Sequence, residues 1–284
     1  MNFRTLIAPE ELHGRLSHPD LRLFDCRHRL TEPEWGHQQY LSGHIPGALF
    51  AHLDRDLSSA VIPGKTGRHP LPAINAFVDT LNRWGVSNTS MVVAYDDAGG
   101  AYAARLWWLL RWLGHDNVAV LDGGLPDWKE AGFATSNELT NVPPRSHFIA
   151  NWQADKTVDA EQIAASFKHS RLQLIDARGS NRYQGLEEPI DPVAGHIPSA
   201  NNLPFTELLD KSQRFLPPSA LKEKLLRVFA PDKENASYCG SGVTACLVVL
   251  AAVHAGLPEP KLYAGSWSEW ITDRSRPIKQ GPQP

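Results

Sequence analysis

The chain has 284 residues, a formal net charge of −3 and 42% hydrophobic residues. This length favours two domains, and the near-neutral charge gives no signature of a nucleic-acid or membrane-surface partner. Three cysteines, an odd number in so long a chain, argue against a disulfide framework and for a reducing compartment. Because no signal-peptide core and no membrane-length apolar run occurs, we expect a cytoplasmic protein.

Short β-branched runs alternate with helical patterns along the chain. In the first half the expected strands cover residues 21–27 and 91–96, and the expected helices cover residues 74–81 and 101–113. A further helix is expected at residues 218–229 in the second half. This alternation predicts α/β domains, each with a mainly parallel sheet flanked by helices.

Four landmarks of the first half return in the second half in the same order. The pairs are Asp25-x-Arg27 with Asp176-x-Arg178, Gly43-His-Ile-Pro with Gly195-His-Ile-Pro, Asp96 with Cys239, and Trp128 with Trp270. The offsets are 151 and 152 residues for the first two pairs and 143 and 142 for the last two. The chain is therefore interpreted as a tandem duplication of whole domains.

The repeat also defines domain boundaries. We predict a first domain at residues 1–140, a linker at 141–156 and a second domain at 157–284. Because the offset shortens between the second and third landmarks, the first half carries extra residues, and the Gly/Pro-rich segment 62–69 is the expected inserted loop.

Cys239 stands where an expected strand meets the apolar helical pattern of residues 243–255. Gly240 and Gly242 permit positive φ, so the intervening amides can turn toward the sulfur. Several N–H groups and a helix N-terminus both favour the thiolate, which is the nucleophilic form. We therefore predict a reactive cysteine, with buried packing of a small apolar residue as the alternative. Cys246, inside the helical pattern, is expected only to pack.

Taken together, the motifs make the whole chain resemble the two-domain rhodanese-like sulfurtransferases. They are Asp-x-Arg, Gly-His-Ile-Pro, the loop Cys239-Gly-Ser-Gly-Val-Thr-Ala and Gly265-Ser-Trp-Ser-Glu-Trp. The resemblance implies two tandem rhodanese-like domains, of which only the second is catalytic, because Asp96 replaces the cysteine in the first. It also implies a Cys239 persulfide that forms from a small sulfur donor and is consumed by cyanide or a thiol, thioredoxin included.

The same resemblance implies roles for further residues. Arg182 in Asn181-Arg-Tyr183 would bind the donor anion, and the loop residues Gly240, Gly242, Val243 and Thr244 would hold the sulfur. Ser241, His69 and Asp54 would form a proton relay, with Asp56 as an alternative to Asp54. Since no His and Cys cluster at metal-ligand spacing occurs, we expect no metal and no cofactor.

The donor is the open point of the resemblance. The loop after Cys239 resembles the 3-mercaptopyruvate branch, which the sequence therefore predicts, with thiosulfate as the alternative donor. Where the mercaptopyruvate enzymes usually carry a second substrate arginine, this chain has Asp191, as animal thiosulfate enzymes tend to. An acidic residue there disfavours an anionic donor unless it points away or another arginine compensates.

The motifs duplicated in both halves are expected to be structural. This applies to the two Asp-x-Arg ion pairs and to His44 and His196.

Two other functions are alternatives to sulfur transfer. A phosphatase of this fold needs an arginine six positions after the cysteine, where this chain has Ala245. A non-catalytic or redox-sensing module would not require the complete glycine loop around its cysteine.

Overall fold

The computed structural model describes residues 5–169 and 171–284, and within these it divides the chain into two compact units. The first unit contains residues 1–59, 71–153 and 212–214, and the second contains residues 60–70, 154–211 and 215–284. The segment 62–69, expected as an inserted loop of the first half, forms no helix or strand and packs with the second unit.

The first unit has a five-stranded parallel sheet in the order β1-β5-β4-β2-β3. Its strands are β1 Leu6–Ile7, β2 Leu21–Asp25, β3 Ala48–Phe50, β4 Met91–Tyr95 and β5 Val118–Leu121. Its helices are α1 Pro9–His13, α2 Trp35–Ser42, α3 Ile74–Arg83, α4 Ala103–Trp112 and α5 Gly124–Glu130. Every residue of β4 is buried, as expected of a central parallel strand covered on both faces.

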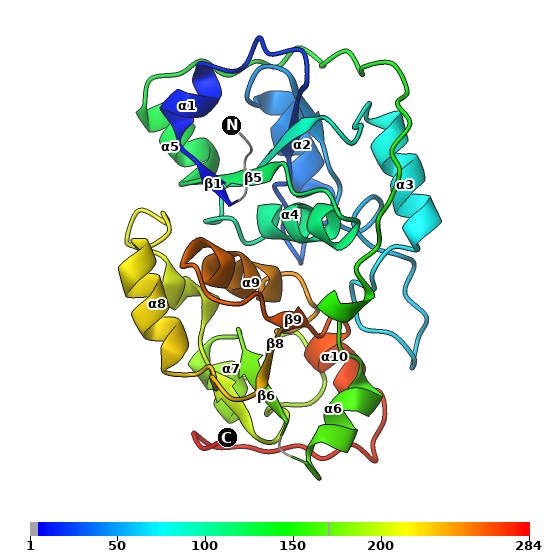
Figure 1. The fold of residues 1–284 in the computed structure, drawn as a ribbon, viewed down its shortest axis with the longest axis vertical. Coiled ribbons are helices and arrows are strands. Elements are labelled where there is room, and N and C mark those ends of the chain that lie inside the picture. The colour runs from blue at the N-terminus through cyan, green and yellow to red at the C-terminus, as the bar shows by residue number, and fades with distance from the viewer. Residues whose placement is uncertain (1–4, 170) are drawn as a thin grey trace. The chain divides into compact units, whose positions relative to one another are not determined.

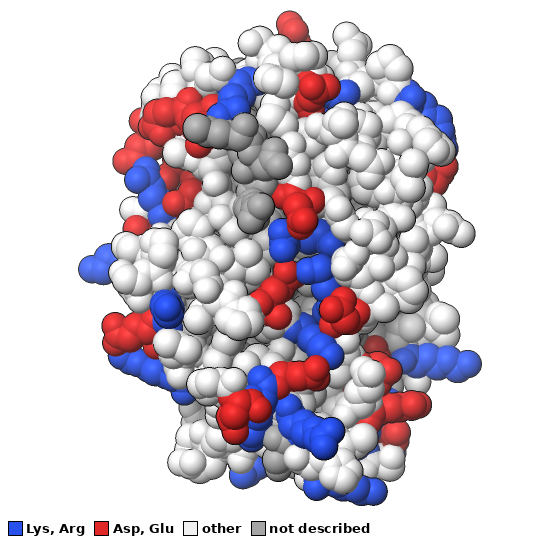
Figure 2. Space-filling model, in the orientation of Figure 1, with Lys and Arg blue, Asp and Glu red and all other residues white. Residues whose placement is uncertain are grey.

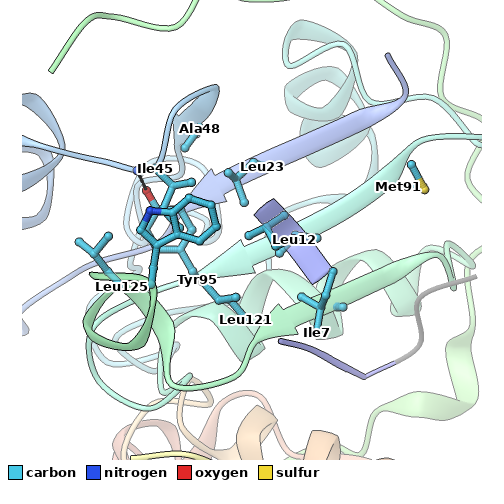
Figure 3. Close-up of a cluster of buried hydrophobic side chains, with 12 residues drawn as sticks. Ile7, Leu12, Leu23, Ile45, Ala48, Met91, Tyr95, Leu121 and Leu125 are labelled. Carbon is cyan, nitrogen blue, oxygen red and sulfur yellow. Dashed lines mark hydrogen bonds between the residues drawn. The ribbon is translucent and has the colours of Figure 1, made fainter. Parts of the chain in front are cut away.

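Helices cover both faces of this first sheet (Figure 1). Leu12 of α1 and Trp128 of α5 pack with Leu23, Val93 and Leu121 on one face. Figure 3 shows Leu12, Ile7 and Leu121 pointing into this shared core. Helix α4, which packs on β4 and β5, is almost entirely buried and contributes three buried tryptophans, Trp107, Trp108 and Trp112.

The second unit has a four-stranded parallel sheet in the order β7-β6-β8-β9. Its strands are β6 Leu172–Asp176, β7 Ala200–Asn202, β8 Glu234–Tyr238 and β9 Lys261–Leu262. Its helices are α6 Ala160–Ser166, α7 Ser180–Gln184, α8 Pro218–Leu226, α9 Ala245–His254 and α10 Ser266–Trp270, with 3₁₀ helices η1 Ala154–Lys156 and η2 Phe205–Leu208. The α/β class with parallel sheets flanked by helices is therefore confirmed.

Helix α9 begins two residues later than the pattern from residue 243 predicted. The backbone of Gly242 has φ +76°, outside the helical region, so residues 240–244 stay in the loop after β8. The helix ends at His254, one residue before the end of the predicted pattern, with Ala255 as its C-cap, and Gly256 follows with φ +72°.

Charged side chains of both signs lie interspersed on the face shown in Figure 2. Surface ion pairs of the protein include Arg227 with Glu223 and Lys261 with Glu234. Among the described helices, none combines the length and apolar character that a bilayer-spanning segment needs.

Candidate active site

Cys239 directly follows β8, at the carboxyl end of a central strand of the second sheet. Ligands of open α/β sheets bind at this edge. The start of α10 fixes the loop: Trp267 N–H donates to the Cys239 carbonyl at 3.0 Å, and Ser268 N–H donates to the Gly240 carbonyl at 2.9 Å. The Cys239 N–H in turn donates to Ser266 Oγ at 3.0 Å. Trp267 thus lies against the loop.

The loop after Cys239 turns its amides toward the sulfur. The Gly242 N–H donates to Cys239 Sγ at 3.2 Å. Burial raises the pKa of the thiol, but hydrogen bonds from the Thr244 side chain and from the N–H groups of Ser241, Ala245 and Gly242 outweigh it. The pKa of Cys239 is therefore lowered below its usual value, and the surroundings stabilise the thiolate.

The two loop glycines meet different requirements. Gly242 needs its positive φ, and a Cβ there would lie 2.1 Å from the Ala264 carbonyl oxygen. Gly240 does not use the positive φ that its sequence permits. A Cβ built on it would lie 2.8 Å from Nη2 of Arg68, so the end of that flexible side chain would have to shift.

Cys26 shows that burial alone does not activate a cysteine in this chain. Cys26 and Cys239 are both 2% exposed. Burial first, and then the negative charges of Asp25, Asp96 and Asp56, raise the pKa of Cys26 well above its usual value. Cys246 is fully buried in α9, as expected of a packing residue.

The equivalent loop of the first unit holds a carboxylate. Asp96, which follows β4, accepts four backbone hydrogen bonds of 2.8–2.9 Å, from the N–H groups of Ala98, Gly100, Tyr102 and Ala103. The duplicated loop is therefore an anion cradle, and in the first unit the protein's own side chain fills it.

Ser241 and His69, two residues expected to form the relay, both belong to the second unit and contact each other. His69 Nδ1 is 2.7 Å from Ser241 Oγ, and both side chains are buried. The preceding residue is anchored by a 3.1 Å hydrogen bond from the Arg68 N–H to Ser268 Oγ. Asp54 belongs to the first unit, where its N–H donates to His52 Nδ1 at 3.1 Å.

Arg182 lies in α7 and is held by two carboxylates. Its Nε and Nη2 donate to Glu188 at 2.6–3.1 Å, and Nη2 also contacts Asp191 at 3.2 Å. Nη1 of Arg68 forms an ion pair with the other oxygen of Asp191. The sequence alone predicts no role for Arg68, because nothing local in residues 62–69 indicates a partner 123 residues away.

The duplicated motifs have structural roles, as predicted. Arg27 pairs with Asp25 at 2.6–3.0 Å, and Arg178 pairs with Asp176 at 2.7–3.1 Å. Each arginine also donates to a carbonyl of the Gly-His-Ile-Pro motif, at Gly43 and Gly195 respectively. These contacts tie the end of a strand to the following loop in both units. The two histidines, His44 and His196, are likewise buried and bonded to main-chain carbonyls.

Comparison with known proteins agrees with this geometry. The model of the rhodanese-like domain matches residues 8–131 and again residues 159–273. The chain therefore belongs to the rhodanese-like family, and to its two-domain sulfurtransferases.

Individual relatives of the chain include proteins named for each donor. A probable 3-mercaptopyruvate sulfurtransferase of Pseudomonas aeruginosa is 48% identical, over 99% of this chain and 100% of the relative. A thiosulfate sulfurtransferase of Mus musculus is 35% identical, over 95% of this chain and 92% of the relative. The solved 3-mercaptopyruvate sulfurtransferase of Leishmania major superposes with a TM-score of 0.83 at 32% identity, covering 94% of this chain and 74% of that one.

Proposed function

We propose that this protein transfers sulfur from 3-mercaptopyruvate to cyanide or a thiol through a persulfide on Cys239. The observation that carries the proposal is the environment of the sulfur. Four hydrogen-bond donors of the loop lower the pKa of a buried thiol, whereas the equally buried Cys26 has a raised pKa. A thiolate held in this way is a preorganised nucleophile.

In the first step the Cys239 thiolate attacks the sulfur of the donor. The new S–S bond forms as the donor's C–S bond breaks, and the bonding pair leaves with the carbon as the enolate of pyruvate. The persulfide then occupies the loop, where the N–H groups of Ser241, Gly242 and Ala245 and the Thr244 hydroxyl stabilise its negative charge. Gly240 and Val243 complete this loop around the sulfur.

The enolate needs a proton to become pyruvate. Ser241 and His69 are the proposed source of this proton, because Ser241 lies in the same loop as Cys239 and its Oγ is 2.7 Å from His69 Nδ1. Asp54 is the proposed acidic partner of His69, on the family resemblance alone. The Arg182 guanidinium is proposed to bind the donor carboxylate, for which its planar donors are suited.

In the second step the acceptor attacks the outer sulfur of the persulfide. The S–S bond breaks, its electron pair returns to Cys239, and the thiolate is regenerated. Cyanide would leave as thiocyanate, and a thiol would leave as a persulfide. Thioredoxin is one proposed protein thiol, and the proposed location is the cytoplasm, which the three free cysteines support.

Paired steady-state kinetics with 3-mercaptopyruvate and thiosulfate test the proposal, with Cys239→Ser beside Cys26→Ser as the matched control. We expect a higher kcat/KM for 3-mercaptopyruvate, lost in Cys239→Ser and kept in Cys26→Ser. A preference for thiosulfate would instead identify that donor and make the proton relay unnecessary. Equal rates in all three proteins would contradict sulfur transfer at Cys239.

A further inference from the structure

The Cys239 loop lies beneath two guanidinium groups, one of which has no assigned role. A Cβ built on Gly240 would lie 2.8 Å from Arg68 Nη2 and 3.6 Å from Arg182 Nη1. These nitrogens come from a loop before α3 and from α7, yet they converge on the residue next to Cys239. A side chain at position 240 would displace the end of the Arg68 side chain.

Asp191 and Glu188 hold the far sides of the two groups. Asp191 binds Arg68 through Nη1 and Arg182 through Nη2, and Glu188 binds Arg182 through Nε and Nη2. Both carboxylates are only 4% exposed, whereas the side chains of Arg68 and Arg182 are 29% and 17% exposed. The acids are thus buried behind the arginines, which are the accessible groups.

The nitrogens that converge over Gly240 are left for another partner. Among residues 5–169 and 171–284, Nη2 of Arg68 and Nη1 of Arg182 donate no hydrogen bond to protein. A guanidinium group has five N–H donors, so an arginine in an ion pair keeps N–H groups that can bind a further acceptor. The group also remains positively charged in proteins. Burial lowers the pKa of Arg68, while the charge of Cys239 acts in the opposite direction, so the guanidinium lies within electrostatic reach of the sulfur.

We infer that Arg68 is a second donor-binding residue, which together with Arg182 binds the carboxylate of the sulfur donor above Gly240. The inference rests on the proposed function and deepens it. Asp191 occupies the sequence position that disfavoured an anionic donor, but its charge is taken up by Arg68 and Arg182. Arg68 is the compensating arginine, supplied by segment 60–70 instead of the chain around residue 191.

This arrangement suits a carboxylate that lies close to the transferable sulfur. In 3-mercaptopyruvate two carbons separate the carboxyl carbon from that sulfur, so one end can lie above Gly240 while the other meets Cys239. Two guanidinium groups presenting one N–H edge each match the two oxygens of a carboxylate. The free edges of Arg68 and Arg182 therefore favour an α-keto acid donor.

Kinetics of Arg68→Gln and Arg68→Lys with 3-mercaptopyruvate test the inference. We expect kcat/KM to fall about 10- to 100-fold in Arg68→Gln, mainly through KM, because one charged hydrogen bond to the donor is lost. In Arg68→Lys the fall in kcat/KM should be smaller, since lysine keeps the positive charge but lacks the planar paired donors of arginine. Arg227→Gln, in an exposed pair of the same unit, is the control and should match the wild type.

A second measurement, alkylation of Cys239, tests the role of Arg68 without any sulfur donor. Iodoacetate and iodoacetamide alkylate the same thiolate, but only iodoacetate carries a carboxylate. The ratio of their rates at Cys239 therefore cancels changes in pKa or in the amount of folded protein. We expect this ratio to fall about tenfold in Arg68→Gln and to stay unchanged in Arg227→Gln.

The two measurements separate the possible failures. If the wild type turns over 3-mercaptopyruvate and Arg68→Gln keeps both its kcat/KM and its alkylation ratio within twofold, the inference is overturned. If the ratio falls but kcat/KM does not, Arg68 attracts anions without binding the donor, which also overturns it. A wild type inactive with 3-mercaptopyruvate overturns the proposed donor, and a falling ratio would then leave Arg68 as an anion-binding residue only.

Discussion

At the scale of single residues, the contrast between Cys239 and Cys26 shows what makes a buried thiol reactive. Both follow a buried strand and both are 2% exposed. Cys239 is surrounded by N–H and O–H donors, whereas carboxylates adjoin Cys26. Hydrogen bonds to the charged form lower a thiol pKa, and like charges raise it. The identity of the neighbours therefore decides the direction in which the thiol pKa shifts, and the degree of burial does not.

Alkylation by iodoacetamide across a pH series should show this difference. The pKa of Cys239 is lowered, so its thiolate persists at neutral pH and its reaction slows only as the pH falls through that lowered pKa. The pKa of Cys26 is raised, so its reaction begins only at high pH. At neutral pH we expect Cys239 to react at least ~10-fold faster, measured by mass spectrometry of the modified peptides. Equal rates would favour the non-catalytic interpretation.

A second residue-scale prediction concerns Ser241. Because its hydroxyl lies 2.7 Å from His69 Nδ1, Ser241→Ala removes the proposed proton source for the enolate. We expect kcat with 3-mercaptopyruvate to fall about 10²-fold, within the range of general acid catalysis, while thiosulfate turnover changes little because sulfite needs no proton. Equal losses with both donors would assign Ser241 to the loop structure alone.

At the scale of the loop, two glycines with the same backbone conformation have different surroundings. Gly242 and Gly256 have φ of +76° and +72°, so both are strained by any side chain. A Cβ on Gly242 would meet the Ala264 carbonyl at 2.1 Å, whereas one on Gly256 would meet nothing within 4 Å. Comparing substitutions at these two glycines therefore separates the loss of stability caused by backbone strain from the loss caused by steric overlap.

Gly256→Ala should lower the free energy of unfolding by about 1–2 kcal/mol, from the left-handed backbone alone. Gly242→Ala should lose a further ~1–3 kcal/mol from overpacking against Ala264, and should also lose activity because the loop amides move away from Cys239. Denaturant unfolding and kcat/KM, measured on both variants, test this. A similar loss of stability and an intact activity in Gly242→Ala would contradict the cradle as described.

How much the sequence predicts can be judged from particular residues. The repeated landmarks predicted a duplicated domain, and the alternation of strand and helix patterns predicted its parallel α/β class. The Asp25–Arg27 and Asp176–Arg178 pairs followed from the same repeat. Arg68 was missed because its importance depends on a contact with Asp191, and local sequence carries no information on pairing between distant loops. The contact above Gly240 was not predicted for a similar reason, since the guanidinium of Arg68 comes from the distant segment 60–70.

At the scale of the whole molecule, duplication left two cradles with different contents. In the second unit the donors of the loop lower the pKa of the Cys239 thiol, the proposed nucleophile. In the first unit the loop is filled by Asp96, whose two oxygens each accept two N–H groups. The first cradle has therefore become a structural feature, with its anion supplied permanently by the chain.

Asp96→Asn tests this division of roles. The variant keeps the shape of the side chain but turns an NH₂ toward two of the four donors, which leaves them without an acceptor. We expect the free energy of unfolding to fall by about 1–3 kcal/mol for each donor left unsatisfied, measured by denaturant unfolding. Asp97→Asn, at the partly exposed neighbouring position, is the matched control and should cost far less. If Asp96→Asn were as stable as Asp97→Asn, the anion would contribute nothing to the first loop, and the likeness between the two cradles would lose its energetic basis.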